Sequence, residues 1–88
     1  MKKVLVYKKA EGCPSCKVLD LLIPRLKVAY PDVEWEFVVI GGEGDANLVP
    51  KHVGSFPTSI LSENGEEKFT VVGYDQITRR MAQAFKAA

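Results

Sequence analysis

Residues 4–23 read VLVYKKAEGCPSCKVLDLLI, and in this stretch an apolar run is followed by two closely spaced cysteines and the start of a helical pattern. The run over residues 4–7 is short, apolar and rich in β-branched side chains, which is typical of a strand buried in a sheet. From residue 14 to about residue 30, apolar side chains recur at helical spacing, and Pro14 suits a first helical turn. Cys13 and Cys16 are therefore predicted to lie where a strand ends and a helix begins.

The rest of the chain predicts three further strands and two further helices. Apolar and polar residues alternate over residues 33–39, and two β-prone runs at 58–61 and 69–72 flank Asn64-Gly65, a strong hairpin signal. A short helix is expected over residues 46–52. The last helix is expected to be capped by Asp75 and to carry one apolar stripe. The members of that stripe are Ile77, Met81, Ala84 and Phe85.

This order predicts an α/β fold of the form β-α-β-α-β-β-α. A parallel crossover followed by a hairpin makes a four-stranded mixed sheet with three helices on its two faces. Pro24 falls inside the first helix and predicts a kink there, not a break, because the apolar stripe continues beyond it. The cysteine loop is expected at the carboxyl end of the sheet, where α/β proteins commonly place their chemistry.

Composition limits the domain count and the classes of partner. The chain has 88 residues, 47% of them hydrophobic, and a formal net charge of +1. One domain over residues 1–88 is expected, without a general attraction to nucleic acid or membranes, and a monomer is the simplest assembly. The N-terminal apolar run is closed by Lys8 and Lys9, far short of a secretory or membrane-spanning segment, which favours a cytoplasmic protein.

The two cysteines can be read as a structural bridge, a metal site or a reactive dithiol. A permanent bridge is disfavoured in a reducing compartment, and closing so short a loop removes little chain entropy. A structural zinc site needs about four ligands, whereas the chain adds only His52 and scattered carboxylates to the cysteines. At a helix N-terminus, partial positive charge stabilises a thiolate, which favours Cys13 as the attacking thiol and the deeper Cys16 as the resolving thiol.

Two segments together resemble the thioredoxin superfamily. AEGCPSCK, residues 10–17, is similar to the thioredoxin active-site segment, and CPSC alone is closer to the glutaredoxin form. VPKHVGSFPTSILSENGEE, residues 49–67, resembles the thioredoxin stretch that carries a cis-proline. The resemblance covers nearly the whole chain and implies a thioredoxin-like fold with a cis peptide before Pro57, packed against the cysteines. The exposed backbone beside a cis-proline can bind a peptide or glutathione as an added strand.

The chain also departs from both families. Gly12 replaces the tryptophan before the first cysteine, Tyr7 replaces a buried aspartate, and the extra N-terminal strand and helix of thioredoxins are absent. Glutaredoxins place an aromatic residue at the position of Ser15. VGYD, residues 72–75, partly matches their glutathione site. The resemblance therefore implies a small glutaredoxin-like thioredoxin.

The expected site follows from these matches. Cys13, Cys16 and Pro57 are expected to be catalytic, with no metal and no cofactor besides the cysteine pair. The supporting residues are Pro14, Ser15 and Lys17. The residues expected to bind substrate are Gly12, Ser55, Phe56, Thr58, Gly73, Tyr74 and Asp75.

The resulting hypothesis is a dithiol–disulfide oxidoreductase that reduces protein disulfides and serves cellular redox homeostasis and electron transport. Thioredoxin reductase or glutathione would supply the electrons, and a ribonucleotide reductase would fit as a substrate. One alternative is a glutaredoxin that uses glutathione as co-substrate. The more remote alternative is a thioredoxin-fold binding module whose dithiol is idle or captures a metal with a partner chain.

Overall fold

A computed structural model of the protein describes residues 1–41 and 54–85. Four strands and two helices occur there: β1 (Lys2–Lys9), α1 (Pro14–Ala29), β2 (Val33–Ile40), β3 (Thr58–Glu63), β4 (Glu66–Val72) and α2 (Ile77–Ala84). The strands form one sheet in the order β2-β1-β3-β4. β1 pairs with β2 in parallel and with β3 antiparallel, and β3 pairs antiparallel with β4. The predicted four-stranded mixed sheet is therefore confirmed.

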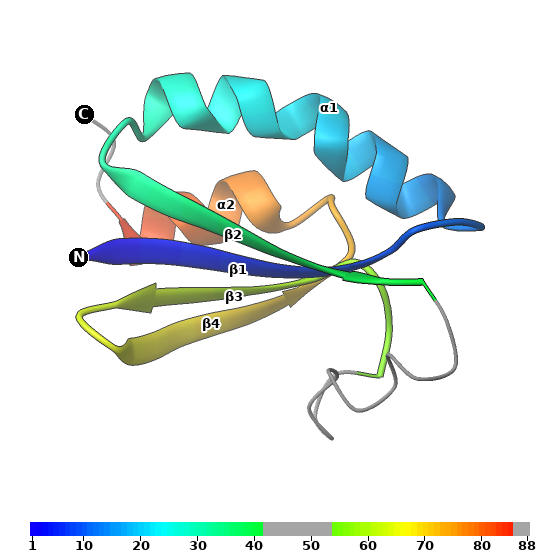
Figure 1. Ribbon diagram of the computed structural model, residues 1–88. Coiled ribbons are helices and arrows are strands. Elements are labelled where there is room, and N and C mark those ends of the chain that lie inside the picture. Colours follow the sequence, from blue (N-terminus) through cyan, green and yellow to red (C-terminus); the bar gives the residue numbers. More distant parts are fainter. Residues whose placement is uncertain (42–53, 86–88) are drawn as a thin grey trace.

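The described residues contain two helices, and the prediction of three helices needs correction. The third, expected over residues 46–52, lies outside the described residues. Both α1 and α2 lie on the same face of the sheet (Figure 1), because their apolar stripes contribute to one shared core. Helices on both faces stay a prediction, since the helix expected over residues 46–52 is not among the described residues.

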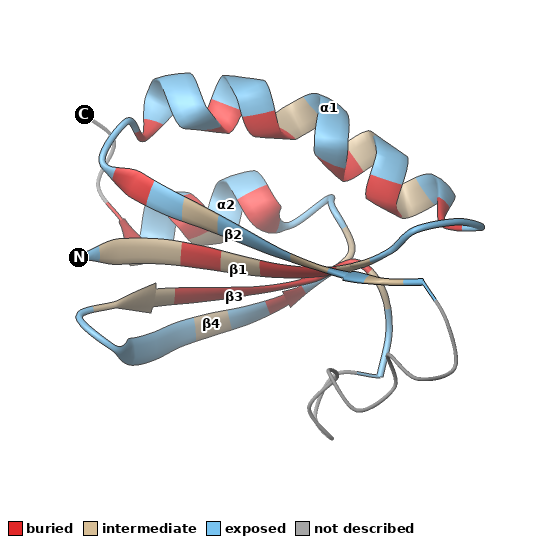
Figure 2. Cartoon of the chain, in the orientation of Figure 1, coloured by how far each residue is buried: buried red, intermediate tan, exposed pale blue. Residues whose placement is uncertain are grey.

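The main core lies between the sheet and the two helices, and Figure 2 marks the buried residues of these elements in red. Side chains alternate between the two faces of a strand. Val4 and Val6 of β1 therefore point to the helices, where they belong to the same cluster as Leu19 of α1 and Met81 of α2. All four side chains are fully buried, so this cluster fixes α1 and its cysteines against β1.

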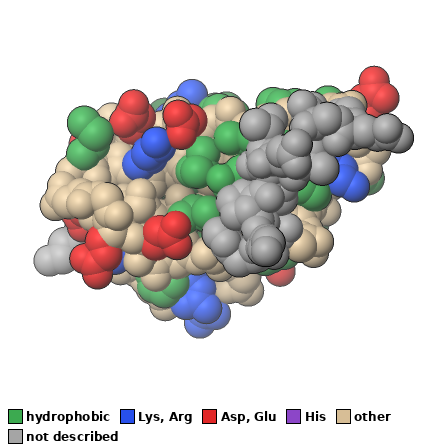
Figure 3. Space-filling model, turned by 60° about the horizontal axis from the view of Figure 1, so that its bottom comes forward, with side chains coloured by type: hydrophobic (Ala, Val, Ile, Leu, Met, Phe, Trp, Pro, Cys, Tyr) green, Lys and Arg blue, Asp and Glu red, His purple; other side chains and the backbone are tan. Residues whose placement is uncertain are grey.

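The opposite face of the sheet carries a smaller cluster. Tyr7 and Ile60 are buried there, and Leu5, Val38 and Phe56 pack against them while remaining partly exposed. Hydrophobic side chains gather near the middle of this face, with charged side chains around them (Figure 3). Phe56 precedes Pro57, so this cluster connects the sheet to the loop that the sequence analysis placed beside the cysteines.

The start of α1 follows from its first residues. Cys13 is the N-cap residue and Pro14 occupies the first turn, where its missing N–H costs no helical hydrogen bond. Pro24 lies within α1, which continues to Ala29, so the prediction that this proline does not break the helix is confirmed. The apolar stripe along α1 explains this continuity, because it is buried on both sides of the proline.

The start of α2 differs from the prediction. Its N-cap residue is Gln76 rather than Asp75, and no side chain provides a capping hydrogen bond. Backbone contacts fix this turn, since the N–H of Ile77 donates to the carbonyl of Tyr74 at 3.4 Å. Burial supplies the rest of the stability, because Ile77 is fully buried at the first position of the helix.

The predicted hairpin between β3 and β4 is confirmed. Asn64 and Gly65 both have positive φ, at 55° and 83°, as a tight two-residue turn of this kind requires. A Cβ atom at Gly65 would meet no other atom within 4 Å, so backbone conformation alone sets the cost of adding one.

Gly65→Ala is therefore expected to lower the free energy of unfolding by about 1–2 kcal/mol, the usual cost of a left-handed conformation for a residue with a Cβ atom. Urea unfolding of the purified proteins measures this. Gly54→Ala is the matched control, because a Cβ there also meets nothing within 4 Å and Gly54 has no positive φ. Equal stabilities of the two variants would contradict the prediction.

Candidate active site

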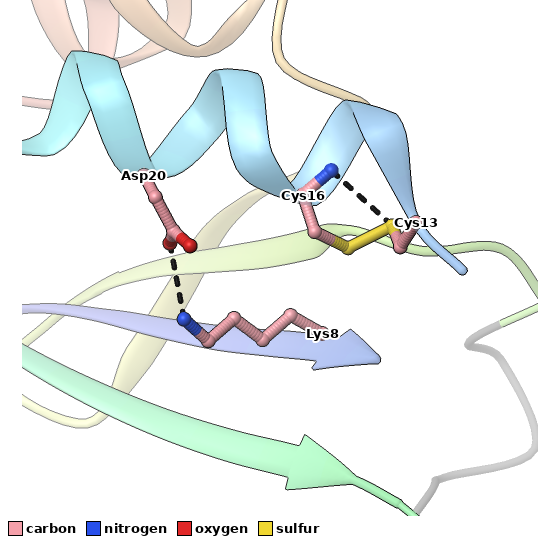
Figure 4. Close-up of polar contacts among 4 residues, drawn as sticks. All are labelled: Lys8, Cys13, Cys16 and Asp20. Carbon is pink, nitrogen blue, oxygen red and sulfur yellow. Dashed lines mark hydrogen bonds and ion pairs between the residues drawn. A yellow bond between two sulfur atoms is a disulfide. The ribbon is translucent and has the colours of Figure 1, made fainter. Parts of the chain in front are cut away.

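The two cysteines form a disulfide at the junction of β1 and α1. The S–S distance is 2.08 Å and the Cα atoms are 5.2 Å apart. Cys13 is the N-cap residue of α1 and Cys16 lies in its first turn, so the bridge spans the end of the helix (Figure 4). The predicted strand-to-helix position of the pair is confirmed.

The two sulfur atoms differ in hydrogen bonding and in exposure at the helix end. The backbone N–H of Cys16 donates to Sγ of Cys13 at 3.2 Å, in addition to its contact with the Cys13 carbonyl at 3.1 Å. An N–H that points at a sulfur favours the thiolate form of that sulfur after reduction. Cys13 is 9% exposed and Cys16 is 3% exposed, which is the predicted order of burial. Cys13 is therefore the better placed of the two to meet another molecule.

The loop before β3 carries the proline that the resemblance singled out. The Phe56–Pro57 peptide bond is cis, as the resemblance implies, and Pro57 is fully buried. Two hydrogen bonds hold the loop. The N–H of Gly73 donates to the Pro57 carbonyl at 2.8 Å, and Oγ1 of Thr58 donates to the Ser55 carbonyl at 2.5 Å. The first contact fixes the loop against the segment that follows β4, and the second closes the turn before β3.

A cavity of about 370 Å³, which we call the cysteine groove, lies between the cysteine loop and the proline loop. Its described lining residues are Lys9, Gly12, Cys13, Pro14, Ser15, Gly54, Ser55 and Phe56. Six of these are residues that the sequence analysis expects in the site: Gly12, Cys13, Pro14, Ser15, Ser55 and Phe56. The fold thus brings together two segments about forty residues apart in the sequence around the more exposed cysteine.

A second cavity, of about 350 Å³, shares Lys9, Gly12 and Cys13 with the groove and also reaches Cys16. We call it the Asp20 pocket. Nζ of Lys8 donates to Oδ1 of Asp20 at 3.0 Å across this pocket, between β1 and α1 (Figure 4). Lys17 also lines it, so this predicted supporting residue faces the pocket rather than the groove.

Asp20 is not among the residues predicted from the sequence to form the site. Its spacing from Cys16 could have indicated it, because Asp20 follows Cys16 by four residues on one helix and residues at this spacing share a helix face. Its partner Lys8 sits on the same face of β1 as Val4 and Val6, which is the face that α1 covers.

The remaining predicted substrate-binding residues lie apart from the lining of both cavities. Thr58 is buried below the proline loop, and Gly73 reaches Pro57 through its backbone. Tyr74 and Asp75 are exposed on the segment between β4 and α2. Their assignment to substrate binding stays a prediction.

The described part of the chain shows neither a metal site nor a membrane-spanning helix. Within residues 1–41 and 54–85, no three side chains of the histidine, cysteine, aspartate or glutamate type come together in a way that could hold a metal ion. None of the helices described there has the length and apolar character needed to cross a membrane.

Known proteins resemble this chain in sequence and structure, although no protein-family model matches it. Thioredoxin-1 of Saccharomyces cerevisiae is 29% identical over 86 residues, which cover 98% of this chain and 82% of that protein. The crystal structure of oxidised thioredoxin O2 from Arabidopsis thaliana is 29% identical, with a TM-score of 0.84 over 98% of this chain and 76% of that one. Oxidised thioredoxin O1 from the same plant is also 29% identical, with a TM-score of 0.82 over 98% and 79% of the two chains.

The similarity extends over the strands, the helices and both loops of the site. The bridged cysteine pair, the helix that starts at it and the cis-proline loop facing it are the elements that the resemblance in the sequence implies. The pair has the C-x-x-C spacing that is typical of dithiol–disulfide oxidoreductases. The chain therefore resembles the thioredoxin superfamily in sequence and fold over nearly its whole length, and its cysteine pair is that of a thiol–disulfide oxidoreductase.

Proposed function

We propose that this protein reduces disulfides in other proteins, in the cytoplasm. An external electron donor then reduces its own cysteine pair again. The observation that carries the proposal is the Cys13–Cys16 bridge at a helix N-terminus, with Cys13 opening onto the cysteine groove. The groove is bounded on its other side by Ser55 and Phe56, the backbone of the cis-proline loop. An extended peptide can pair with such a backbone while its disulfide meets Cys13.

The reaction is a pair of thiol–disulfide exchanges. The Cys13 thiolate attacks one sulfur of the substrate disulfide, the substrate S–S bond breaks, and the other substrate sulfur leaves as a thiolate that takes up a proton. Cys16 then loses its proton and attacks Sγ of Cys13 in the mixed disulfide, which releases the second substrate thiol. The substrate gains two electrons and two protons, and the protein is left with the Cys13–Cys16 bridge.

Catalysis of insulin reduction by dithiothreitol tests the proposal. The wild-type protein should accelerate precipitation of the insulin B chain, because each cycle transfers electrons from dithiothreitol through the cysteine pair. A Cys13→Ser variant is the control and should give the background rate. A wild-type rate equal to background would instead support a binding module with an idle or metal-capturing dithiol.

The electron donor distinguishes the thioredoxin route from the glutathione route. Two observations support thioredoxin reductase: the similar proteins are thioredoxins, and the residues that partly match a glutathione site, Gly73 and Asp75, do not line the cysteine groove. A ribonucleotide reductase fits this route as a protein substrate. No organic prosthetic group enters the proposed cycle.

We expect thioredoxin reductase with NADPH to recycle the oxidised protein faster than glutathione with glutathione reductase and NADPH does. The rate of NADPH consumption, with insulin as final acceptor, measures both routes in the same unit. Each reductase is first assayed with its own natural partner, to show that it is active. Faster turnover with glutathione would assign the protein to the glutaredoxin alternative.

A further inference from the structure

Four lysines lie along β1, and three of them are held in ion pairs. These pairs are Lys2 with Asp32 at 2.9 Å, Lys3 with Glu36 at 2.9 Å and Lys8 with Asp20 at 3.0 Å. The hydrogen bond from Lys2 lowers the pKa of Asp32, and the hydrogen bond to Glu36 raises the pKa of Lys3. Each of these three charges therefore has a carboxylate that balances it within the chain.

The fourth, Lys9, has a different neighbour. Among the residues that the structure describes, no carboxylate lies within 4 Å of its ammonium group. Its Nζ atom lies instead over the ring of Phe56, 5.5 Å from the ring centre. An aromatic face attracts a cation but leaves its positive charge uncompensated. Strand alternation explains the difference, because Lys8 points to α1 while Lys9 points to the face that carries Tyr7 and Phe56.

This uncompensated charge lies in the cysteine groove. Lys9 and Cys13 line the groove together, and Lys9 is the only charged side chain among its described lining residues. The other charged side chains near the cysteines line the Asp20 pocket, which Lys9 also reaches; they are Lys8, Glu11, Lys17 and Asp20. A substrate disulfide that reaches Cys13 through the groove therefore meets a positive potential from one side chain.

We propose that Lys9 selects protein disulfides in which an acidic side chain lies within two residues of the cysteine that Cys13 attacks. The inference rests on the proposed function and adds a substrate class to it. An extended segment advances about 3.3 Å per residue, so such a carboxylate stays within reach of a lysine that shares the groove with Cys13. A basic side chain at the same place would be repelled by Lys9. The contact with Phe56 restricts the lysine side chain before the substrate arrives, which reduces the entropy lost on binding.

The test uses three peptide disulfides that differ only in the residue next to the cysteine, which is Glu, Gln or Lys. For the wild-type protein, kcat/KM should be about threefold to tenfold higher with the Glu peptide than with the Lys peptide, the effect expected of one partly exposed charge pair. At about 1 M salt the ratio should approach one, because the screening length then falls to about 3 Å. Lys9→Gln should remove most of the ratio, and Lys9→Glu should invert it.

Lys27→Gln is the matched control. Lys27 is exposed in the last turn of α1, remote from the groove lining, so this variant should keep the wild-type ratio. Thermal melts of the variants show whether each is folded. Inversion by Lys9→Glu is a readout that a loss of structure cannot produce, since a misfolded variant would be slow with all three peptides.

The outcomes separate this inference from the proposed function. If no peptide is reduced faster than by dithiothreitol alone, the proposed function fails. If the wild-type protein reduces all three at equal rates, the proposed function stands and the role of Lys9 is overturned. Glutathione disulfide is assayed alongside, because its carboxylates are another source of the same charge. If Lys9→Glu slows only glutathione disulfide and leaves the order of the peptides unchanged, the acidic-peptide proposal is also overturned.

Discussion

Cys16→Ser is expected to accumulate a stable mixed disulfide between Cys13 and a substrate, with turnover reduced to the background rate. The reason is the division of roles at the helix end. Sγ of Cys13 receives the N–H of Cys16 and keeps the larger exposure, so the attack on a substrate survives the change. A serine hydroxyl does not attack a disulfide at neutral pH, so the resolving step is lost.

Mass spectrometry after incubation with a peptide disulfide measures this adduct. Cys13→Ser is the matched variant and should carry no adduct, because Cys16 is 3% exposed and has little access to a substrate sulfur. Addition of dithiothreitol should release the peptide from Cys16→Ser, which identifies the link as a disulfide. An adduct on Cys13→Ser and none on Cys16→Ser would reverse the two roles.

Leu19→Ala is expected to lower the free energy of unfolding by about 2–5 kcal/mol, as is usual when a fully buried leucine is truncated. Leu19 is 0% exposed and belongs to the cluster that joins α1 to Val4 and Val6 of β1. A domain of this size has a total stability of about 4–13 kcal/mol. The variant therefore loses a large part of its stability, and the position of the cysteines on the sheet weakens with it.

Leu21→Ala is the matched control for this change. Leu21 lies on the same helix but is 75% exposed, so its truncation should alter stability by no more than about 0.5 kcal/mol. Urea unfolding followed by circular dichroism compares the two variants with the wild-type protein. Similar midpoints for Leu19→Ala and Leu21→Ala would show that α1 does not depend on this packing.

Local sequence signals were sufficient for most of the elements. The apolar run of β1, the stripe of α1 and the Asn64-Gly65 turn each act through neighbouring residues, and all three appear where they were predicted. The C-x-x-C spacing likewise indicated a reactive dithiol at the start of a helix. Such features depend on side-chain periodicity and on backbone conformation within a few residues, which one sequence contains in full.

The local capping preference of the sequence was a less reliable guide to where α2 begins. A good capping residue, Asp75, predicted the start of α2 one residue too early, because the packing of Ile77 into the core and backbone hydrogen bonds define that start instead. The placement of both described helices on one face also went beyond local preference. An amphipathic stripe says that a helix covers a core, but it does not say which face of the sheet that core occupies.

By itself, the sequence determined the order of the described elements, the place of the cysteines at a strand-to-helix junction and the resemblance of the proline loop to that of thioredoxins. Only the tertiary structure decided which charges meet at the site. Lys8 and Lys9 are neighbours in the sequence, yet one pairs with Asp20 on α1 and the other lies over Phe56 in the cysteine groove. The physical reason is that successive side chains of a strand point to opposite faces, and their partners come from segments that only the folded chain brings to each face.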